Sequence, residues 1–244
     1  MIEHYGGRCH LVDDATTVDE ISRRVAAECR GHYMDQFTYA ERATDWRGNN
    51  NIAESMFDQL ARERHPVPEW IVMGAGTGGT SATVGRYVRY RQHPTRLCVV
   101  DPEGSVFADY FDTGDRALRG PGSRVEGIGR PRVEPSFVAS VIDRVVRVPD
   151  TASFAAMRVL SRWLHRRVGG STGTGFYGAL GLVAEMLDDG RQGSVVGLIC
   201  DAGDRYVHTY YDDAWLAGQG CDIEPVEARL EAFLATGSWA WGTG

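Results

Sequence analysis

IVMGAGTGGT, residues Ile71–Thr80, is the stretch that decides the fold class of this 244-residue chain. Its apolar start is typical of a buried strand, and the helical pattern Gly79–Tyr90 follows directly after the glycines. Glycines let a turn point several backbone N–H groups at one spot, where a helix N-terminus adds about half a positive charge. The stretch therefore predicts an anion-binding turn between a strand and a helix. The alternative is a glycine-rich turn that packs closely and binds nothing.

Apolar runs bounded by turn residues alternate with amphipathic stretches along most of the chain, which predicts an α/β protein with a largely parallel sheet. The expected strands are Arg8–Val12, Glu69–Met73, Arg96–Val100, Arg144–Val148 and Ser194–Cys200. The expected helices are Val18–Cys29, Asn51–Arg64, Gly79–Tyr90, Ala152–Arg166, Gly175–Leu187 and Val226–Leu234. Asp101–Arg124 and Gly127–Phe137 lack periodicity and are rich in Gly, Pro and Asp, so we expect long loops that cover a site.

All 26 basic residues are arginine, so the chain contains no lysine. This excludes a Schiff base on a lysine of this chain. The net charge of −7, with arginines scattered among acids, argues against nucleic acid and anionic membranes as partners. The apolar runs are far shorter than the roughly 20 residues of a membrane helix, and the start of the chain lacks the pattern of a signal peptide. We therefore expect a cytoplasmic protein.

The cysteines and histidines show no metal-ligand or disulfide pattern. The five cysteines are odd in number, widely spaced and without a CxxC pair, which is typical of structural or incidental thiols: Cys9, Cys29, Cys98, Cys200 and Cys221. The histidines likewise lack the spacing of a metal site. We expect no metal.

Two functional interpretations of the glycine stretch compete. Gly74, Gly76 and Gly79 satisfy the dinucleotide pattern G-x-G-x-x-G after a strand, and Asp101 follows about 20 residues later, as an NAD site requires. The string Gly76–Thr80, however, resembles the pyridoxal-phosphate phosphate loop of the cysteine synthase and cystathionine β-synthase family, the fold-type II enzymes of β-replacement and β-elimination.

The resemblance continues in order along nearly the whole chain. Downstream, the segments resemble the family's "DPEGS", "QGIG", "GGSAG" and "DSGERY" motifs: Val100–Ser105, Glu126–Gly129, Val168–Gly173 and Asp201–Tyr206. Upstream, Ile2–Gly7 resembles its "YGA" turn and Asp35–Phe37 its "QF" segment. The resemblance implies an open, mostly parallel doubly wound sheet, similar to that of the tryptophan synthase β chain, lacking its N-terminal part.

The same resemblance implies the cofactor and the site. Pyridoxal 5'-phosphate would be held by the glycine stretch, through Gly76, Thr77, Gly78, Gly79 and Thr80. In that family the first serine of the "GGSAG" turn, here Ser171, hydrogen-bonds the pyridine nitrogen. Gln36 would face the carboxylate of a small amino-acid substrate, and Gly127 lies in the loop beside the cofactor on the substrate side. The activity implied is β-elimination or β-replacement on cysteine-type amino acids by a homodimer in the full-length form.

Ser171 has a chemical argument of its own. A neutral serine opposite the pyridine nitrogen leaves the ring unprotonated, so the electron sink is weaker and suits the loss of a β-leaving group. The alternative is structural, because serine is a frequent N-cap and Ser171 precedes the helix expected at Gly175–Leu187.

Two stretches depart from the common cysteine synthase pattern. Asp45–Glu54 stands where those enzymes carry a Thr-Thr-Gly-Pro-Glu segment, and Glu126–Pro135 adds Arg130 and Arg132. These arginines either clamp a carboxylate or form a solvated charged loop. Both stretches resemble the actinobacterial cysteine desulfhydrase branch, which releases sulfide from cysteine.

In the resembled family the Schiff-base lysine and a carboxylate-binding loop lie upstream, early in the chain, and neither occurs here. We therefore expect residues 1–36 to be a remnant of the small N-terminal domain and residues 37–244 to be the large pyridoxal-phosphate-binding domain. The chain would be the C-terminal two-thirds of such an enzyme, inactive alone. A non-catalytic paralogue that binds pyridoxal phosphate or a partner chain, and an NAD-binding domain, are the alternatives.

Overall fold

The computed structural model describes residues 2–13, 17–47 and 51–239. A four-stranded sheet lies at its centre, and every neighbouring pair of strands is parallel. The strand order is β3-β2-β1-β4, with β1 (Trp70–Gly74), β2 (Arg96–Pro102), β3 (Arg144–Val148) and β4 (Val195–Gly197). This confirms the parallel sheet expected from the sequence.

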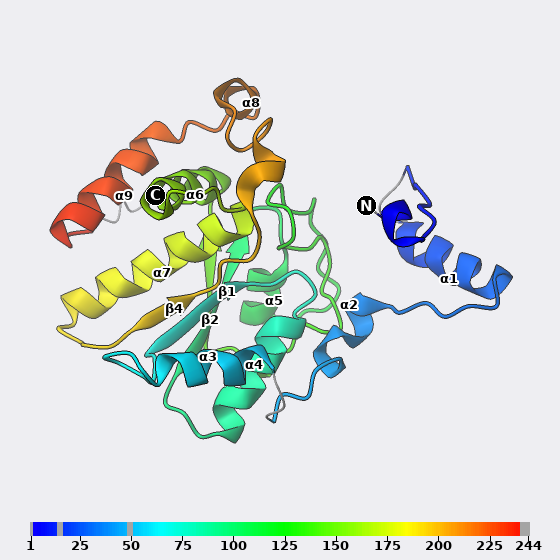
Figure 1. Ribbon diagram of the computed structural model, residues 1–244, viewed down its shortest axis with the longest axis horizontal. Helices are drawn as coiled ribbons and strands as arrows, with labels where there is room; N and C mark the ends of the chain where they lie inside the picture. Colours follow the sequence, from blue (N-terminus) through cyan, green and yellow to red (C-terminus); the bar gives the residue numbers. More distant parts are fainter. Residues whose placement is uncertain (1, 14–16, 48–50, 240–244) are drawn as a thin grey trace.

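Helices cover both faces of the sheet, with α6, α7 and α9 on one face and α3, α4 and α5 on the other (Figure 1). The nine α-helices of the described residues are α1 (Val18–Glu28), α2 (Gln36–Tyr39), α3 (Ile52–Leu60), α4 (Gly79–Tyr90), α5 (Phe107–Thr113), α6 (Asp150–Leu164), α7 (Gly170–Asp188), α8 (Asp213–Gly218) and α9 (Glu224–Thr236). Alternate strand residues serve the two faces: Val72 packs with α7, whereas Ile71 and Met73 pack with α4. A parallel sheet buried on both sides explains the continuous apolar runs.

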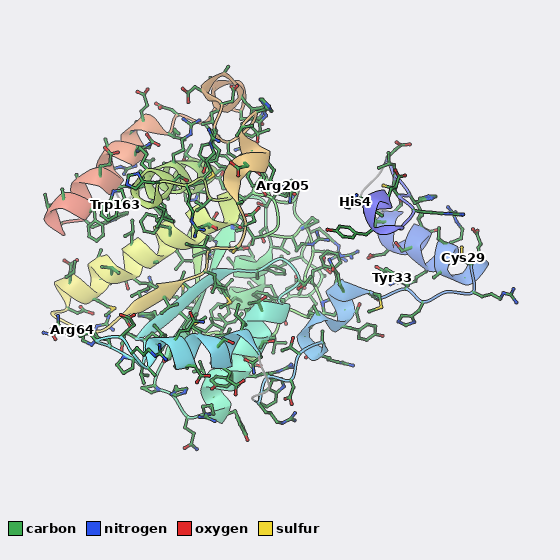
Figure 2. All side chains as sticks on the ribbon, viewed as in Figure 1. His4, Cys29, Tyr33, Arg64, Trp163 and Arg205 are labelled. Carbon is green, nitrogen blue, oxygen red and sulfur yellow. The ribbon has the colours of Figure 1, made fainter. Side chains whose placement is uncertain are left out.

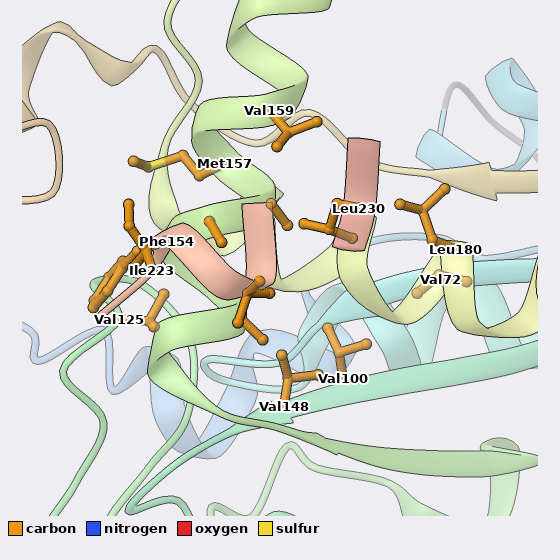
Figure 3. Packing of buried hydrophobic residues seen from close by; sticks show 14 of the residues in the cluster. Val72, Val100, Val125, Val148, Phe154, Met157, Val159, Leu180, Ile223 and Leu230 are labelled. Atoms are coloured by element: carbon orange, nitrogen blue, oxygen red, sulfur yellow. The ribbon is translucent and has the colours of Figure 1, made fainter. Parts of the chain in front are cut away.

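The larger hydrophobic cluster fixes α6, α7 and α9 against the sheet (Figure 3). Phe154, Met157 and Val159 of α6 and Leu230 of α9 are fully buried in it. Burying one such side chain contributes about 1.5–3 kcal/mol. This packing holds the N-terminus of α7, and with it the first-turn residue Ser171, in a defined position.

The strand expected at Arg8–Val12 is wrong. These residues form no strand, and Leu11 is 88% exposed. An apolar stretch becomes a strand only when a neighbouring strand pairs with it, and this segment lies beside α1, away from the sheet (Figure 1).

The segment Asp101–Arg124, expected to be a loop throughout, contains α5. The carboxylate of Asp101 accepts a hydrogen bond from the Ala108 backbone at 2.7 Å, within the first turn of this helix. The Phe107 ring stacks on Phe137 at 4.1 Å between centroids. These tertiary contacts stabilise a short helix that the periodicity of the sequence did not predict. Gly127–Phe137, in contrast, contains no helix or strand, as expected.

Several element boundaries differ from those expected. The bounds of α4 and β3 are those predicted, but α3 ends at Leu60 instead of Arg64, and β4 is shorter than Ser194–Cys200. The largest difference is α7, which begins at Gly170 instead of Gly175. The glycines of its first turn concealed its start, because glycine is a poor helix former.

The N-terminal segment has no core of its own. No residue of α1 is buried, and the helix lines an apolar groove of about 700 Å³. All five cysteines are free, and Cys98 and Cys221 are buried. None of the described helices is both long and apolar enough to cross a membrane.

Candidate functional site

The turn between β1 and α4 presents unpaired backbone donors. We call residues Gly76–Thr80 the glycine cup. Gly78 has a φ of +89°, a left-handed conformation that favours glycine, and the Thr77 hydroxyl accepts a hydrogen bond from the Gly79 N–H at 3.1 Å. The N–H groups of Thr77, Gly78 and Thr80 donate to no other residue that the structure describes. These donors, at the N-terminus of a twelve-residue helix, suit an anion.

Three other segments approach the glycine cup too closely for a side chain. A Cβ at Gly76 would lie 2.3 Å from the Gly127 oxygen, and one at Gly78 would lie 2.6 Å from the Ser136 oxygen. A Cβ at Gly79 would lie 2.9 Å from that of Ala40. The close packing proposed as the alternative is therefore present, but packing alone leaves the N–H donors without partners.

Gly127 lies beside the glycine cup, where the resemblance placed it. Its carbonyl faces Gly76, and the nearby Gly129 N–H donates to the Ala75 oxygen at 2.8 Å. The space above Gly127 is open, since a Cβ there would meet no atom within 4 Å. The loop thus packs against the cup through the Gly127 carbonyl, while the Cβ position of Gly127 is open.

Ser171 lies in the first turn of α7 and is 7% exposed. The helix is capped by Gly169, so the interpretation of Ser171 as an N-cap is wrong. The Ser171 hydroxyl makes no hydrogen bond with another described residue, and it remains available to a ligand.

Tyr210 connects the turn of Ser171 to the loop of Gly127. Its ring lies against Gly170, where a Cβ would come within 2.9 Å. Its hydroxyl donates to the Arg124 oxygen at 2.8 Å and accepts from the Glu126 N–H at 3.0 Å. The sequence did not predict a role for Tyr210, because its partners Arg124 and Glu126 lie more than 80 residues away and the sequence around Tyr210 gives no sign of that contact.

The "DSGERY"-like segment, Asp201–Tyr206, also contacts the first turn of α7, which carries Ser171. The Gly169 N–H donates to the Asp201 oxygen at 3.1 Å, and the Cys200 N–H donates to the Thr172 hydroxyl at 3.0 Å. The Tyr206 hydroxyl donates to the Asp201 carboxylate at 2.8 Å, and burial together with this bond raises the pKa of Tyr206. The first two of these contacts fix the start of α7 at two points, and the third orders the segment that makes them.

Gln36 is the first residue of α2. The segment that follows it contacts the glycine cup and the loop beside it, but the side-chain amide of Gln36 does not. Ala40, directly after α2, lies against Gly79, and the Phe37 oxygen accepts a hydrogen bond from the Ser136 N–H at 3.2 Å. The Gln36 side chain is exposed. Within Asp45–Glu54, one of the two departures from the family pattern, residues 48–50 lie outside the described residues.

Arg130 and Arg132 bind carboxylates of the chain itself, so they do not form a freely solvated loop. Both donate to Glu134, whose side chain is 1% exposed, at 2.8 and 3.2 Å. Arg132 also donates to Asp19 of α1. That hydrogen bond lowers the pKa of Asp19 and raises that of Arg132.

Asp101 does not offer the acceptor that an NAD site needs. It is 2% exposed, and burial raises the pKa of its carboxyl to about 6. One oxygen is held by the Ala108 N–H, and the other is buried without a partner. A ribose hydroxyl cannot reach it.

A cavity of about 880 Å³ lies elsewhere, at the carboxyl end of β4. Arg158, Arg162, Arg166, Arg167, Asp201 and Tyr211 are among its lining residues. No residue predicted for the site lines it, so we do not take it as the cofactor site. Across the described ranges, no group of His, Cys, Asp and Glu side chains could hold a metal ion.

Comparison with known proteins decides the family. A sequence profile described as "Pyridoxal-phosphate dependent enzyme" matches residues 1–201. The chain belongs to this family. The membership of a pyridoxal-phosphate-dependent family, inferred from the motifs, is thereby confirmed, and the matched residues include the glycine cup.

Named relatives within the family include enzymes of cysteine metabolism. The chain is 59% identical over 240 residues to the L-cysteine desulfhydrase Cds1 of Mycobacterium tuberculosis, covering 98% of this chain and 65% of that protein. It is 30% identical over 211 residues to cysteine synthase 2 of Emericella nidulans, covering 80% of this chain and 46% of that protein. The chain is thus markedly shorter than these curated relatives.

A solved structure confirms the family fold. The crystal structure of O-ureido-L-serine synthase superposes with a TM-score of 0.68 at 22% identity, covering 88% of this chain and 67% of that chain. The open parallel sheet covered by helices on both faces is therefore that of fold-type II enzymes.

The family's cofactor fits the residues of the cup. The unpaired N–H groups of Thr77, Gly78 and Thr80 match the acceptor oxygens of a phosphate. The missing side chains of Gly76 and Gly78 make room for the backbone of Gly127 and Ser136, so glycine at these two positions serves the packing around the cup. The free hydroxyl of Ser171 is a hydrogen-bonding group of the kind that a pyridine nitrogen needs.

Proposed function

We propose that the chain is the cofactor- and substrate-binding part of an enzyme that carries out pyridoxal-phosphate-dependent β-elimination or β-replacement on cysteine-type amino acids. The observation that carries the proposal is the 59% identity with an L-cysteine desulfhydrase over 98% of the chain. The geometry of the glycine cup supports it, since that cup has free donors and no basic side chain.

Each predicted site residue has a defined task in this proposal. The N–H groups of Gly76–Thr80 bind the phosphate, and Ser171 hydrogen-bonds the ring nitrogen without protonating it. Gln36 binds the carboxylate of the substrate, and Gly127 leaves open space on the substrate side. The bound cofactor supplies the electron sink, and a neutral partner at its nitrogen favours loss of a β-substituent over transamination.

The reacting amine is not in this sequence, because none of its 244 residues is lysine. We therefore propose that residues 1–36 belong to a small domain and residues 37–244 to the large domain of a longer enzyme, a cytoplasmic homodimer. The chain alone would bind the cofactor and leave it unreacted.

Reconstitution tests the proposal. Sulfide release from L-cysteine is measured for the chain with pyridoxal phosphate, and for the chain co-expressed with the part of the mycobacterial desulfhydrase that it does not match. We expect sulfide only from the combination, and we expect Ser171→Ala to reduce it. Sulfide from the lysine-free chain alone, or borohydride trapping of the cofactor on one of its side chains, would contradict the proposal.

A second candidate is a non-catalytic protein that uses the cup to bind a phosphate ester. The absence of lysine favours it, because a paralogue without catalysis needs none. Inactivity of the combination, together with tight cofactor binding by the chain, would establish this second function.

A further inference from the structure

The loop Arg130–Phe137, here the clamp loop, contacts both the glycine cup and the segment that carries Gln36. At the cup, the Ser136 oxygen and the Phe137 backbone lie so close to Gly78 that a Cβ there would meet them at 2.6 Å. Toward α2, the Ser136 N–H donates to the Phe37 oxygen at 3.2 Å, and its hydroxyl accepts from the Glu41 N–H at 3.3 Å. Ser136 thus lies between the two halves of the site.

A buried carboxylate organises the clamp loop. Glu134 accepts hydrogen bonds from Arg130 and Arg132, and its side chain is 1% exposed. A buried charge is stable only when it is paired, and the hydrogen bond from Arg130 keeps Glu134 paired when Arg132 is replaced. The guanidinium of Arg130 also lies over the Phe37 ring of α2, 4.1 Å from its centroid.

Arg132 also connects the clamp loop to α1. It donates to one oxygen of Asp19, while the Tyr33 hydroxyl donates to the other at 2.8 Å. Tyr33 lies on the extended segment between α1 and α2 (Figure 2). Asp19 therefore receives one bond from the clamp loop and one from the chain that leads into Gln36.

No residue of α1 is buried, so hydrophobic packing does not fix the helix. Polar contacts such as the Asp19 bonds are what hold it and the linker in place. This dependence distinguishes Arg132 from the exposed arginines elsewhere in the chain, whose ion pairs contribute little.

We propose that Arg132 is a positioning residue that sets the distance between Gln36 and the glycine cup, by joining Asp19 to the buried Glu134. The inference rests on the proposed function, because it assigns the 36–41 segment to the substrate carboxylate. Arg132 touches neither the cofactor nor the substrate. Its removal leaves the phosphate site intact and loosens the carboxylate site.

Two stable probes separate these sites in the lysine-free chain. Pyridoxamine 5'-phosphate carries the phosphate, the ring and an amine, whereas phosphopyridoxyl-L-alanine adds the amino-acid carboxylate. For Arg132→Gln we expect affinity for the first probe to stay within about twofold, and affinity for the second to fall about tenfold, as for one lost bond to a charged group. A general loss of structure would weaken both equally and would overturn the proposal.

Arg119 provides the matched control. Its backbone forms an isolated bridge with that of Arg132, but among the described residues its guanidinium donates only to the backbone oxygens of Arg116, Ala117 and Leu118. Arg119→Gln should change neither affinity. A tenfold loss for phosphopyridoxyl-L-alanine in this variant as well would contradict the assignment to Arg132.

Hydrogen exchange tests the connection without any ligand. The amides of Val18–Glu28 should exchange faster in Arg132→Gln and in Asp19→Asn than in the wild type, and the double variant should exchange no faster than either. Unchanged or additive rates would overturn the proposal. If neither probe binds the wild-type chain, the proposed function fails, and the exchange rates alone decide the role of Arg132.

Discussion

Replacing Gly76 by alanine should weaken phosphate binding about a hundredfold. The new Cβ would lie 2.3 Å from the backbone oxygen of Gly127, about 1 Å closer than van der Waals contact allows. Because the obstacle is backbone, the turn itself must move, and the N–H groups of Thr77 and Gly78 move with it. A displacement of about 1 Å at a binding site costs about a hundredfold, which corresponds to one or two lost bonds to a charged group.

Calorimetric titration with pyridoxamine 5'-phosphate measures this loss, after circular dichroism has shown that the variant is folded. Overpacking should also lower the free energy of unfolding by about 1–3 kcal/mol, so the titration is done well below the melting temperature. Gly175→Ala in α7 is the control, since its Cβ meets no atom within 4 Å. It should bind normally and be more stable by about 0.5–1 kcal/mol. A folded Gly76→Ala variant with wild-type affinity would refute the geometry assigned to the cup.

Two further predictions concern Ser171 and Asp101. Ser171→Ala should weaken the binding of pyridoxamine 5'-phosphate about five- to tenfold and leave the binding of inorganic phosphate unchanged, because only the ring loses a hydrogen bond. Equal affinity of the wild type and the variant for pyridoxamine 5'-phosphate would contradict the role of Ser171. Burial raises the pKa of Asp101 from 3.8 to about 6, so the folded chain holds this proton to higher pH than the unfolded chain. Stability should therefore fall by up to about 3 kcal/mol as the pH rises from well below 4 to well above 6, and Asp101→Asn should lack this part of the decline in urea unfolding.

The sequence predicted the sheet because a parallel strand buried on both faces is apolar throughout. β1 and β2 carry this signal, and the glycine stretch marks the end of β1. The same signal is misleading at Arg8–Val12, where an apolar stretch has no neighbouring strand to pair with. A local pattern reports the preference of a segment, but not whether a partner lies beside it.

The residues predicted for the site came from motifs, and their roles remain predictions. The structure shows Gly127 against the glycine cup, and Tyr210 joins the loop of Gly127 to the turn that carries Ser171. Tyr210 and Ser136, which hold the surrounding segments together, have no local signal because their partners are far away in the sequence. Arg130 and Arg132 stood out by composition, but only the structure shows that they bind the chain's own carboxylates.

The central claim is that the backbone N–H groups of the glycine cup bind the phosphate of the cofactor. Nuclear magnetic resonance of the ¹⁵N-labelled chain, titrated with pyridoxamine 5'-phosphate, tests it most directly. The amide signals of Thr77, Gly78 and Thr80 should shift saturably, with the same midpoint as the calorimetric titration, and unphosphorylated pyridoxamine should leave them in place. Saturable shifts confined to other residues, or none with the phosphate ester, would contradict the claim.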